Sequence, residues 1–521
     1  MASLALAGAR AQSALSVAPG APALPTQAPK QDDTVSLGFN RIVIARWGDA
    51  VLPNAPAFNP NPLTLTQADR QFPWDASIAA LIAQAPQDGI PQSVLVLANP
   101  SAPARMVFPE GMDHPATAGR LQGATILNLQ YVSGTWALVD GGYQSRRLND
   151  GTLCEITGPV AANIGGTVQG LLAPQAGCAT PWGNVLLAEG HSARWLARLS
   201  GATGFGFSNP LDAPRFGWVA ELNPMDPLSF PAKRTALGHF ARAGIAAAST
   251  ADGHAVIFMS QDAPAGFFFR FIAATAATDG TALDSGTLAV AQIQGSSITW
   301  VNLGSDVPTL VGTLSAAANA GGSVFDAPGG IAIAPDHSGL YLACAGNPAR
   351  DSASTNPLNP RAADDNGHVL VFTPPGGDLT ASQFPGRLIL AAGDPATTEG
   401  TQYAPGSDCW LTRPRTLNLD PALNLWIGTD QNGAVSATAD GLFIMQTGGP
   451  SPFLLSLAYL APLGAAIGGA AFDSATGSVF CPVRHPGATP SASFNFPATR
   501  WPTLRPNMPP QTTLIGLIRT I

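Results

Sequence analysis

One stretch of the chain, CATPWGNVLLAEG (178–190), holds two residues that could bind a metal ion. Cys178 precedes a rigid Thr-Pro-Trp-Gly turn, and Glu189 ends an apolar run that we expect to form a strand. A carboxylate after a buried run is costly unless something pairs with it, and a metal ion would do so. Backbone donors or an arginine would also satisfy it. The alternatives are a metal site, the remains of one, and a strand that ends in water.

Common catalytic motifs are absent from the sequence. It has no Walker loop, no G-x-G-x-x-G that opens a helix, no H-E-x-x-H and no G-x-S-x-G. The stretches DDNG (364–367) and DQNG (430–433) lack the alternating ligands and the closing glutamate of a calcium loop, so we predict hairpin turns there. The seven histidines are scattered, none at metal-ligand spacing, and we expect most of them to be hydrogen-bonded structural residues.

The composition of the 521 residues indicates a large β protein with many turns. Hydrophobic residues make up 45% of the chain, enough for a sizeable core, and 56 Gly and 48 Pro are spread between short apolar runs. A net charge of −8 without a Lys/Arg cluster argues against binding to nucleic acid or to an anionic membrane surface. No uninterrupted apolar run reaches the roughly 18 residues that a transmembrane helix needs, so we expect no transmembrane segment.

Short strand candidates recur from residue 35 onward, with turn signals between them. Examples are SVLVLA (93–98), AVIFMS (255–260) and HVLVF (368–372). Several candidates share a Pro-containing turn between two strands, a pattern that is typical of propeller blades. We predict helices only around 75–85 and 456–466, where the apolar spacing fits a helical period. No composition shift marks a boundary, so residues 33–521 are expected to form one propeller-like domain with long insertions.

Residues 1–32 form an Ala/Pro-rich arm ahead of this domain. Its small residues resemble the end of an export signal, but the basic segment that such a signal needs is missing. Either the true start lies upstream, or the arm belongs to the mature chain and packs on its own fold or on a neighbour. Charged residues are only 11% of the chain, against about 25% in ordinary domains. A surface with so few charged residues is expected either to be covered by other subunits or to reflect an acidic or extracellular habitat.

The five cysteines are widely spaced, without a C-x-x-C pair. They are expected to be buried thiols, or to form one or two disulfides with one thiol left over.

Taken in order, several stretches resemble the PhoX family of exported bacterial alkaline phosphatases. They are GFNRIVIARWGDAV, TPWGNVLLAEG, RFGWVAELNPMDPLSFPAKRTALGHF, NPRAADDNGHVLVF, LNLWIGTD and RHPG. The resemblance covers about residues 33 to 520 and implies an all-β fold, a six-bladed β-propeller with inserted helices and long loops. It also implies a cluster of iron and calcium ions, held by carboxylates and a cysteine, that polarises a phosphoryl oxygen and activates an attacking oxygen.

At several positions where the resemblance implies a metal ligand, the sequence keeps a residue that can serve as one. These candidate metal ligands are Glu189, Asp262, Asp430, Asn99 and Cys178. The sequence also keeps Arg147 and Asn347 as candidate substrate-binding residues. Other ligand positions are substituted, namely Ser101, Gly190, Ala243 and Gly329 in place of Glu, and Arg415 in place of Asp. Losing that many carboxylates leaves too little negative charge for a centre of several cations.

Three functions remain open from the sequence. The first is a PhoX-fold protein without phosphatase activity and without a cofactor, which serves as a binding or assembly subunit in an oligomer or larger complex with itself or other proteins. The second is a working calcium-dependent phosphomonoesterase with a reduced metal centre of calcium or iron. The third is a protein that binds a small ligand in the cleft where the resemblance implies the metal centre. In each case the resemblance implies a periplasmic or extracellular location.

Overall fold

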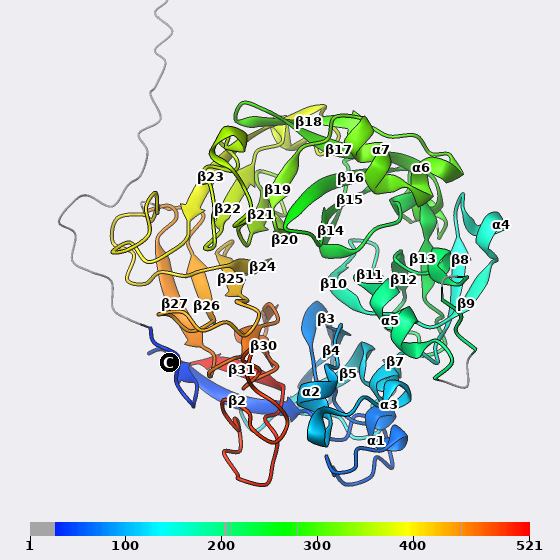
Figure 1. Cartoon of the computed structure of the whole chain (residues 1–521), viewed down its shortest axis with the longest axis vertical. Coiled ribbons are helices and arrows are strands. Elements are labelled where there is room, and N and C mark those ends of the chain that lie inside the picture. The colour runs from blue at the N-terminus through cyan, green and yellow to red at the C-terminus, as the bar shows by residue number, and fades with distance from the viewer. Residues whose placement is uncertain (1–26, 203–205, 210, 279, 450, 521) are drawn as a thin grey trace, which may run out of the picture.

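The structure is a computed structural model that describes residues 27–520 except 203–205, 210, 279 and 450. Most of the chain forms β-sheets arranged as blades around a central axis (Figure 1). Four sheets are single blades, and one ten-stranded sheet joins two blades through the pairing of β18 (Ser297–Asn302) with β23 (Gln383–Ala391). The prediction of an all-β, six-bladed propeller is confirmed.

Each blade is built on an antiparallel meander whose first strand lies closest to the axis, and the second blade adds a parallel pair of strands. The first blade contains β3 (Ser77–Gln87), β4 (Ile90–Asn99), β5 (Gly123–Val132), β6 (Thr135–Leu138) and β7 (Arg146–Leu148). The second contains β10 (Pro174–Ala179), β11 (Val185–Glu189), β12 (Val219–Leu222) and β13 (Ala232–Arg234), with β8 (Leu153–Thr157) and β9 (Thr167–Gln169) at its outer edge. Its parallel pair is that of β13 with β8. The third contains β14 (Arg242–Ser249), β15 (His254–Gln261), β16 (Ala265–Ala276), β17 (Gly286–Gln294) and β18, with β19 (Val324–Asp326) paired to β16.

The remaining three blades complete the ring. The fourth contains β20 (Pro328–Ile333), β21 (Leu340–Cys344), β22 (His368–Phe372) and β23. The fifth contains β24 (Pro414–Leu419), β25 (Leu425–Thr429), β26 (Gly441–Met445), β27 (Leu455–Leu460) and β1 (Thr34–Val35). The sixth contains β28 (Ala466–Ile467), β29 (Ala471–Asp473), β30 (Ser478–Arg484), β31 (Thr513–Arg519) and β2 (Phe39–Arg46).

The two ends of the chain close the ring together. Strand β2, near the N-terminus, pairs antiparallel with β31, near the C-terminus, from Phe39 opposite Arg519 to Arg46 opposite Thr513. Figure 1 shows the blue and red strands side by side at this closure. The outer strand of the last blade is thus supplied by the beginning of the chain.

Helices occupy the connections between strands. The α-helices are α1 (Leu65–Arg70), α2 (Ala104–Val107), α3 (Pro115–Leu121), α4 (Ala161–Ile164), α5 (Ser192–Leu199), α6 (Val307–Val311) and α7 (Thr313–Asn319). Short 3-10 turns span Pro109–Gly111, Ala213–Arg215, Thr235–Leu237, Ala282–Asp284, Ser352–Ser354 and Pro375–Gly377. Within the described residues, none of these helices is long and apolar enough to cross a membrane.

Both helix predictions from the sequence are wrong. Residues 75–85 fall largely in β3, and residues 456–466 contain the end of β27, a turn and the start of β28. The innermost strand of a blade is covered by neighbouring blades on both faces, so apolar residues need not alternate along it. In β3 the isoleucines and leucines therefore fall at a helical spacing by coincidence, while pairing with β4 holds the segment extended.

The hydrophobic core is divided among the spaces between adjacent blades. One such cluster joins Phe258, Phe268 and Trp300 of the third blade to Leu370 and Phe372 of the fourth. All five cysteines are free in the structure, with Cys178 half-buried and the other four buried. The structure therefore contains free thiols and not disulfides at the five cysteines.

Residues 1–26 of the predicted N-terminal arm lie outside the described part of the chain. Its last residues lie on the propeller itself. The carbonyl oxygen of Gln27 accepts a hydrogen bond from the Ala439 amide at 2.7 Å, and that of Lys30 accepts one from the Leu463 amide at 2.7 Å. The end of the arm is therefore held by loops at the fifth blade.

Candidate active site

A cavity of about 1010 Å³ lies on the propeller axis, lined by the innermost strands of all six blades. The first residues of neighbouring inner strands approach one another closely. A side chain at Gly244 of β14 would meet the carbonyl oxygen of Gly329 of β20 at 2.1 Å, and one at Gly329 would meet the carbonyl oxygen of Arg415 of β24 at 2.7 Å. Glycine is required at these approaches because a Cβ would collide with backbone. Position 329, where the resemblance implies Glu, therefore has no room for a side chain.

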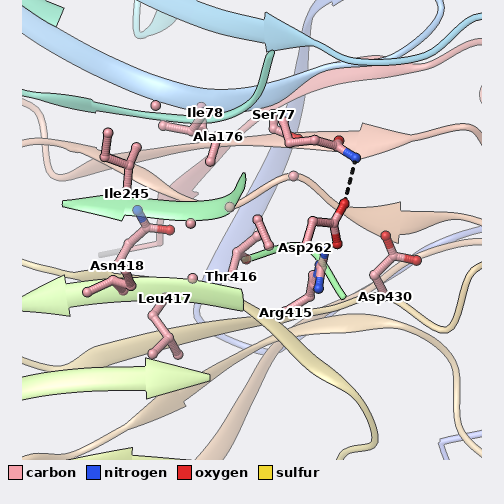
Figure 2. Close-up of a pocket in the computed structure, with 18 of the residues that line it drawn as sticks. Ser77, Ile78, Ala176, Ile245, Asp262, Arg415, Thr416, Leu417, Asn418 and Asp430 are labelled. Carbon is pink, nitrogen blue, oxygen red and sulfur yellow. Dashed lines mark hydrogen bonds and ion pairs between the residues drawn. The ribbon is translucent and has the colours of Figure 1, made fainter. Parts of the chain in front are cut away.

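Charged side chains gather at this end of the cavity. Because the second strand of each blade runs antiparallel to the first, residues that follow the second strand lie beside residues that open the first. Asp262 and Asp430 follow β15 and β25, while Arg415 is near the start of β24 and Arg484 ends β30. Figure 2 shows Asp262, Arg415 and Asp430 on one side of the cavity.

Asp262 is the centre of a hydrogen-bonded cluster. Its Oδ1 accepts from Arg415 Nη2 at 2.6 Å, and its Oδ2 lies 3.0 Å from His191 Nε2 and 3.3 Å from Gln175 Nε2. Burial by itself would raise the pKa of the Asp262 carboxyl, but Arg415 and His191 hold it well below its usual range. Asp262 is therefore a carboxylate whose charge is already neutralised by protein groups.

A second cluster is built around Arg484. Its guanidinium binds Asp75 through Nε at 2.8 Å and Nη2 at 3.1 Å, and binds Asp430 Oδ2 through Nη1 at 3.1 Å. Bidentate pairing of this kind fixes the plane of the guanidinium as well as its position. Burial would lower the pKa of Arg484, but the two aspartates raise it above its ordinary value. Arg484 is thus a fixed positive charge in the wall of the cavity.

Arginines outnumber aspartates in the lining of this site. It contains four arginines (Arg194, Arg413, Arg415 and Arg484) and two aspartates. Two further aspartates outside the lining complete the ion pairs, because Asp75 pairs with Arg484 and Asp365 pairs with Arg413. The side chain of Arg194, in the first turn of α5, makes no hydrogen bond or ion pair with any described residue, although its backbone amide donates to the His191 carbonyl oxygen at 3.1 Å. A concave site with unpaired guanidinium donors suits an anion.

Glu189, a metal-ligand candidate from the sequence, lies away from this lining. It is fully buried, and its Oε1 accepts from Lys233 Nζ at 2.8 Å and from the Leu172 amide at 2.9 Å. Its Oε2 accepts from the Gly217 and Trp218 amides at 2.7 and 3.2 Å. Both oxygens therefore have partners from the protein, one of them a buried ammonium group.

Asn99 and Arg147 are brought together, but also outside the cavity. Arg147 Nη1 donates to Asn99 Oδ1 at 3.2 Å and to Thr125 Oγ1 at 2.6 Å, and its Nη2 donates to backbone carbonyl groups of Arg120 and Leu121. Burial lowers the pKa of Arg147 to about 10. The structure thus places this pair within a network that ties β4, β5 and β7 together.

Cys178 and Asn347 do line the cavity. Burial raises the pKa of the Cys178 thiol to about 12, so the thiol stays protonated at neutral pH. Asn347 Oδ1 accepts from the Ala349 amide at 3.0 Å, a short turn that fixes the side chain against its own loop. The cavity therefore brings together Asp262, Asp430, Cys178 and Asn347, but not Glu189, Asn99 or Arg147.

Several cavity residues were missed from the sequence. His191, Arg194 and Arg484 carry no motif of their own, although Arg484 opens the quoted RHPG stretch. Arg415 was noticed only as a charge reversal at a ligand position. Its ion pair with Asp262 shows what the reversal does, because an arginine at this place supplies the positive charge beside the carboxylate.

The described residues do not fit a centre of several metal ions. Among them, no group of three or more His, Cys, Asp and Glu side chains is arranged to hold a cation. Asp262 is paired with Arg415, and Asp430 with Arg484, so the acidic groups in the lining already have cationic partners. Cations placed among these arginines would meet like charge.

A six-bladed propeller with an anion-attracting axial cavity is the class of protein that the fold and the site define. A family model described as alkaline phosphatase PhoX matches residues 23–487. The chain belongs to this family.

Comparison with solved structures agrees at the level of the fold. The structure of Pseudomonas fluorescens PhoX in complex with vanadate, a transition-state analogue, is 23% identical and has a TM-score of 0.84, covering 95% of this chain and 97% of that chain. A Trichoderma reesei carbohydrate-active enzyme of family AA12 (9% identity, TM-score 0.33, 81% and 98% covered) is much less similar. So is a Dyadobacter fermentans protein of unknown function (9% identity, TM-score 0.35, 94% and 100% covered). No curated protein matches the sequence.

The family match corrects one expectation. We expected no cofactor, but PhoX homologues are metal-dependent phosphatases that use calcium and iron, and this contradicts it. The substituted ligand positions were a poor basis for the expectation, because they describe one arrangement of ligands and not every way in which a chain can bind a metal.

The stability of this region is expected to depend on pH through Asp440. Burial, with a smaller contribution from the negative charge of Asp430, raises the pKa of the Asp440 carboxyl to about 7. The folded state then keeps a proton that the unfolded state releases above about pH 4, so this contribution is complete below pH 4 and is lost as the pH rises through 7. In Asp440→Asn, urea unfolding should show a gain relative to the parent of up to about 1.4 kcal/mol per pH unit across this window. Parallel pH curves for the two proteins would contradict this assignment.

Proposed function

We propose that the protein is a phosphatase that binds a phosphate monoester in the axial cavity and hydrolyses it. The observation that carries this proposal is the group of arginines at the charged end of the cavity, where Arg194 and Arg415 keep guanidinium donors without a partner among the described residues. Family membership supports the reaction class. In the reaction a water oxygen bonds to phosphorus, the bond from phosphorus to the alcohol oxygen breaks, and the alcohol leaves with a proton.

The arginines have two different tasks in this proposal. Arg415 uses Nη2 for Asp262, and in the described part of the chain its Nε and Nη1 have no partner. The guanidinium group of Arg194 has no partner among the described residues, so these two side chains are available to phosphate oxygens. Arg484 has its donors committed to Asp75 and Asp430, and it contributes a fixed positive charge. Charge-assisted bonds from guanidinium to phosphate are among the strongest that proteins form.

Family homologues draw their chemistry from calcium and iron, which polarise the phosphoryl oxygen and activate an attacking oxygen. The described side chains do not form the carboxylate cage for such a cluster, so we assign them only binding and orientation. Asp262 holds Arg415 and His191 in place, and Asp430 holds Arg484.

A second candidate is a binding or assembly subunit without turnover. The ion pairing of both lining aspartates favours it, because a paired carboxylate is less free to serve as a base or ligand. The scarcity of charge in the chain supports association with itself or with other proteins, and family membership supports a periplasmic or extracellular location.

Turnover of p-nitrophenyl phosphate separates the two candidates. The purified protein would be assayed as isolated, after chelation, and after addition of calcium and iron, with binding of inorganic phosphate measured in parallel by calorimetry. Release of p-nitrophenol by any preparation supports the phosphatase. Phosphate binding without turnover in every preparation supports the second candidate, and the absence of both contradicts the assignment of the cavity as a phosphate site.

A further inference from the structure

The axial cavity has a second part with a different chemistry. The charged lining residues lie at the beginnings of the inner strands, at or just after the ends of the second strands, or, for Arg194, in the first turn of α5. Further along the inner strands, the lining carries no charged side chain in the described residues. It is made of small and aliphatic groups, among them Leu81, Ala176, Ala247, Ile333 and Leu419.

These aliphatic residues are reachable from the cavity. Leu81, Ala247, Ile333 and Leu419 are only half-buried, although they lie at the axis of the fold. Figure 2 shows Ile245 and Leu417 at the left of the view and Asp262 and Asp430 to the right. The cavity therefore has exposed hydrocarbon that water covers unless a ligand replaces it.

The length of this part follows from strand geometry. Leu419 lies four residues beyond Arg415 along β24, and a strand rises about 3.3 Å per residue, so the aliphatic lining extends about 13 Å from the guanidinium end. Polar groups interrupt it at Thr416 and Asn418. Asn418 Oδ1 already accepts from the Ala470 amide at 2.8 Å. One end of the cavity thus suits an anion and the rest suits a hydrocarbon.

We propose that the ligands of this cavity are phosphate monoesters of apolar alcohols. The inference rests on the proposed function and specifies its substrate class. The phosphate lies against Arg415 and Arg194, and the hydrocarbon of the ester lies along β14, β20 and β24 toward Ile333 and Leu419. A charged or hydroxyl-rich alcohol is disfavoured, because its polar groups would lose water without gaining partners. An apolar chain gains by leaving water, in proportion to the area that it buries.

A series of alkyl phosphates tests the proposal. Dissociation constants of inorganic, butyl, hexyl and octyl phosphate and of glycerol phosphate would be measured by calorimetry at concentrations below micelle formation. We expect affinity to rise by up to about fourfold per methylene, as burial of one methylene implies. Glycerol phosphate is expected to bind no more tightly than inorganic phosphate. Equal affinity for all of these esters would overturn the inference.

Matched substitutions locate the hydrocarbon. In Leu419→Gln and Ile333→Gln, octyl phosphate should bind about tenfold more weakly, while inorganic phosphate binds as before. Leu228→Gln is the control, because Leu228 is 80% exposed and lies outside the cavity lining. Unchanged binding of octyl phosphate in both cavity variants contradicts the inference.

The series also separates this inference from the proposed function. Turnover of p-nitrophenyl phosphate together with flat chain-length dependence keeps the phosphatase and removes the apolar substrate class. Tight, chain-length-dependent binding without turnover keeps the substrate class as a ligand class and removes the hydrolysis. Loss of binding for every phosphate, octyl phosphate included, contradicts both.

Discussion

Replacing Lys233 with methionine will lower the free energy of unfolding by about 3–5 kcal/mol. Lys233 and Glu189 are both fully buried and lie 2.8 Å apart, and the Lys233 ammonium also lies 4.0 Å from the centre of the Phe216 ring. Methionine has a similar length but no charge, so the change leaves the Glu189 carboxylate buried without its cation. Three backbone amides remain bonded to it and are not enough to replace a full charge.

Urea unfolding followed by tryptophan fluorescence measures this loss. The control is the double variant Glu189→Gln/Lys233→Met, which removes both charges and should recover part of the stability, because a buried pair costs much of its own attraction in desolvation. A loss of unfolding free energy below about 1 kcal/mol for Lys233→Met would contradict a buried ion pair between Lys233 and Glu189.

Replacing Arg415 with glutamine is expected to lower kcat/KM for p-nitrophenyl phosphate by about 10- to 150-fold, which corresponds to one or two lost charge-assisted hydrogen bonds. The side chain loses its unpaired donors, and Asp262 loses the cation that neutralises it. An uncompensated carboxylate would then face the bound phosphate, and the repulsion adds to the loss.

The measurement is steady-state hydrolysis, with phosphate affinity determined in parallel. Arg46→Gln is the matched control, since Arg46 pairs with Asp49 at 3.2 Å on the outer blade surface, away from the cavity lining. If Arg415→Gln and Arg46→Gln retain equal kcat/KM, the assignment of Arg415 to phosphate binding is wrong. If the protein binds phosphate without turnover, the same comparison applies to the dissociation constant.

The blades could be predicted from sequence because most of their strands follow one another in local meanders, with β1 and β2 among the exceptions. Apolar runs separated by Gly- and Pro-rich turns specify neighbouring antiparallel strands. The family motifs also occur in the expected order along the chain, which indicates the order of the blades. The inner strand β3 was mistaken for a helix because its burial depends on two other blades, and those contacts leave no period in the segment itself.

The site was harder to predict than the fold. Asp262 and Asp430 could be chosen because their positions after strands match a family pattern, and both do line the cavity. Their partners Arg415 and Arg484 could not be assigned, because each comes from a blade distant in sequence: Arg415 lies 153 residues from Asp262. Glu189 looked like a ligand because the sequence does not reveal that Lys233 enters from two strands away.

The pairing of β2 with β31 sets the order in which the protein can be completed. Strand β2 is synthesised long before its partner β31 (Thr513–Arg519). Until β31 is made, β2 presents unpaired backbone groups and the sixth blade lacks its outer edge, a state that is prone to pairing with other chains. A chain that stops before residue 513 would therefore leave β2 without its partner as well as the sixth blade without β31, so one truncation would disturb two segments that lie far apart in the sequence.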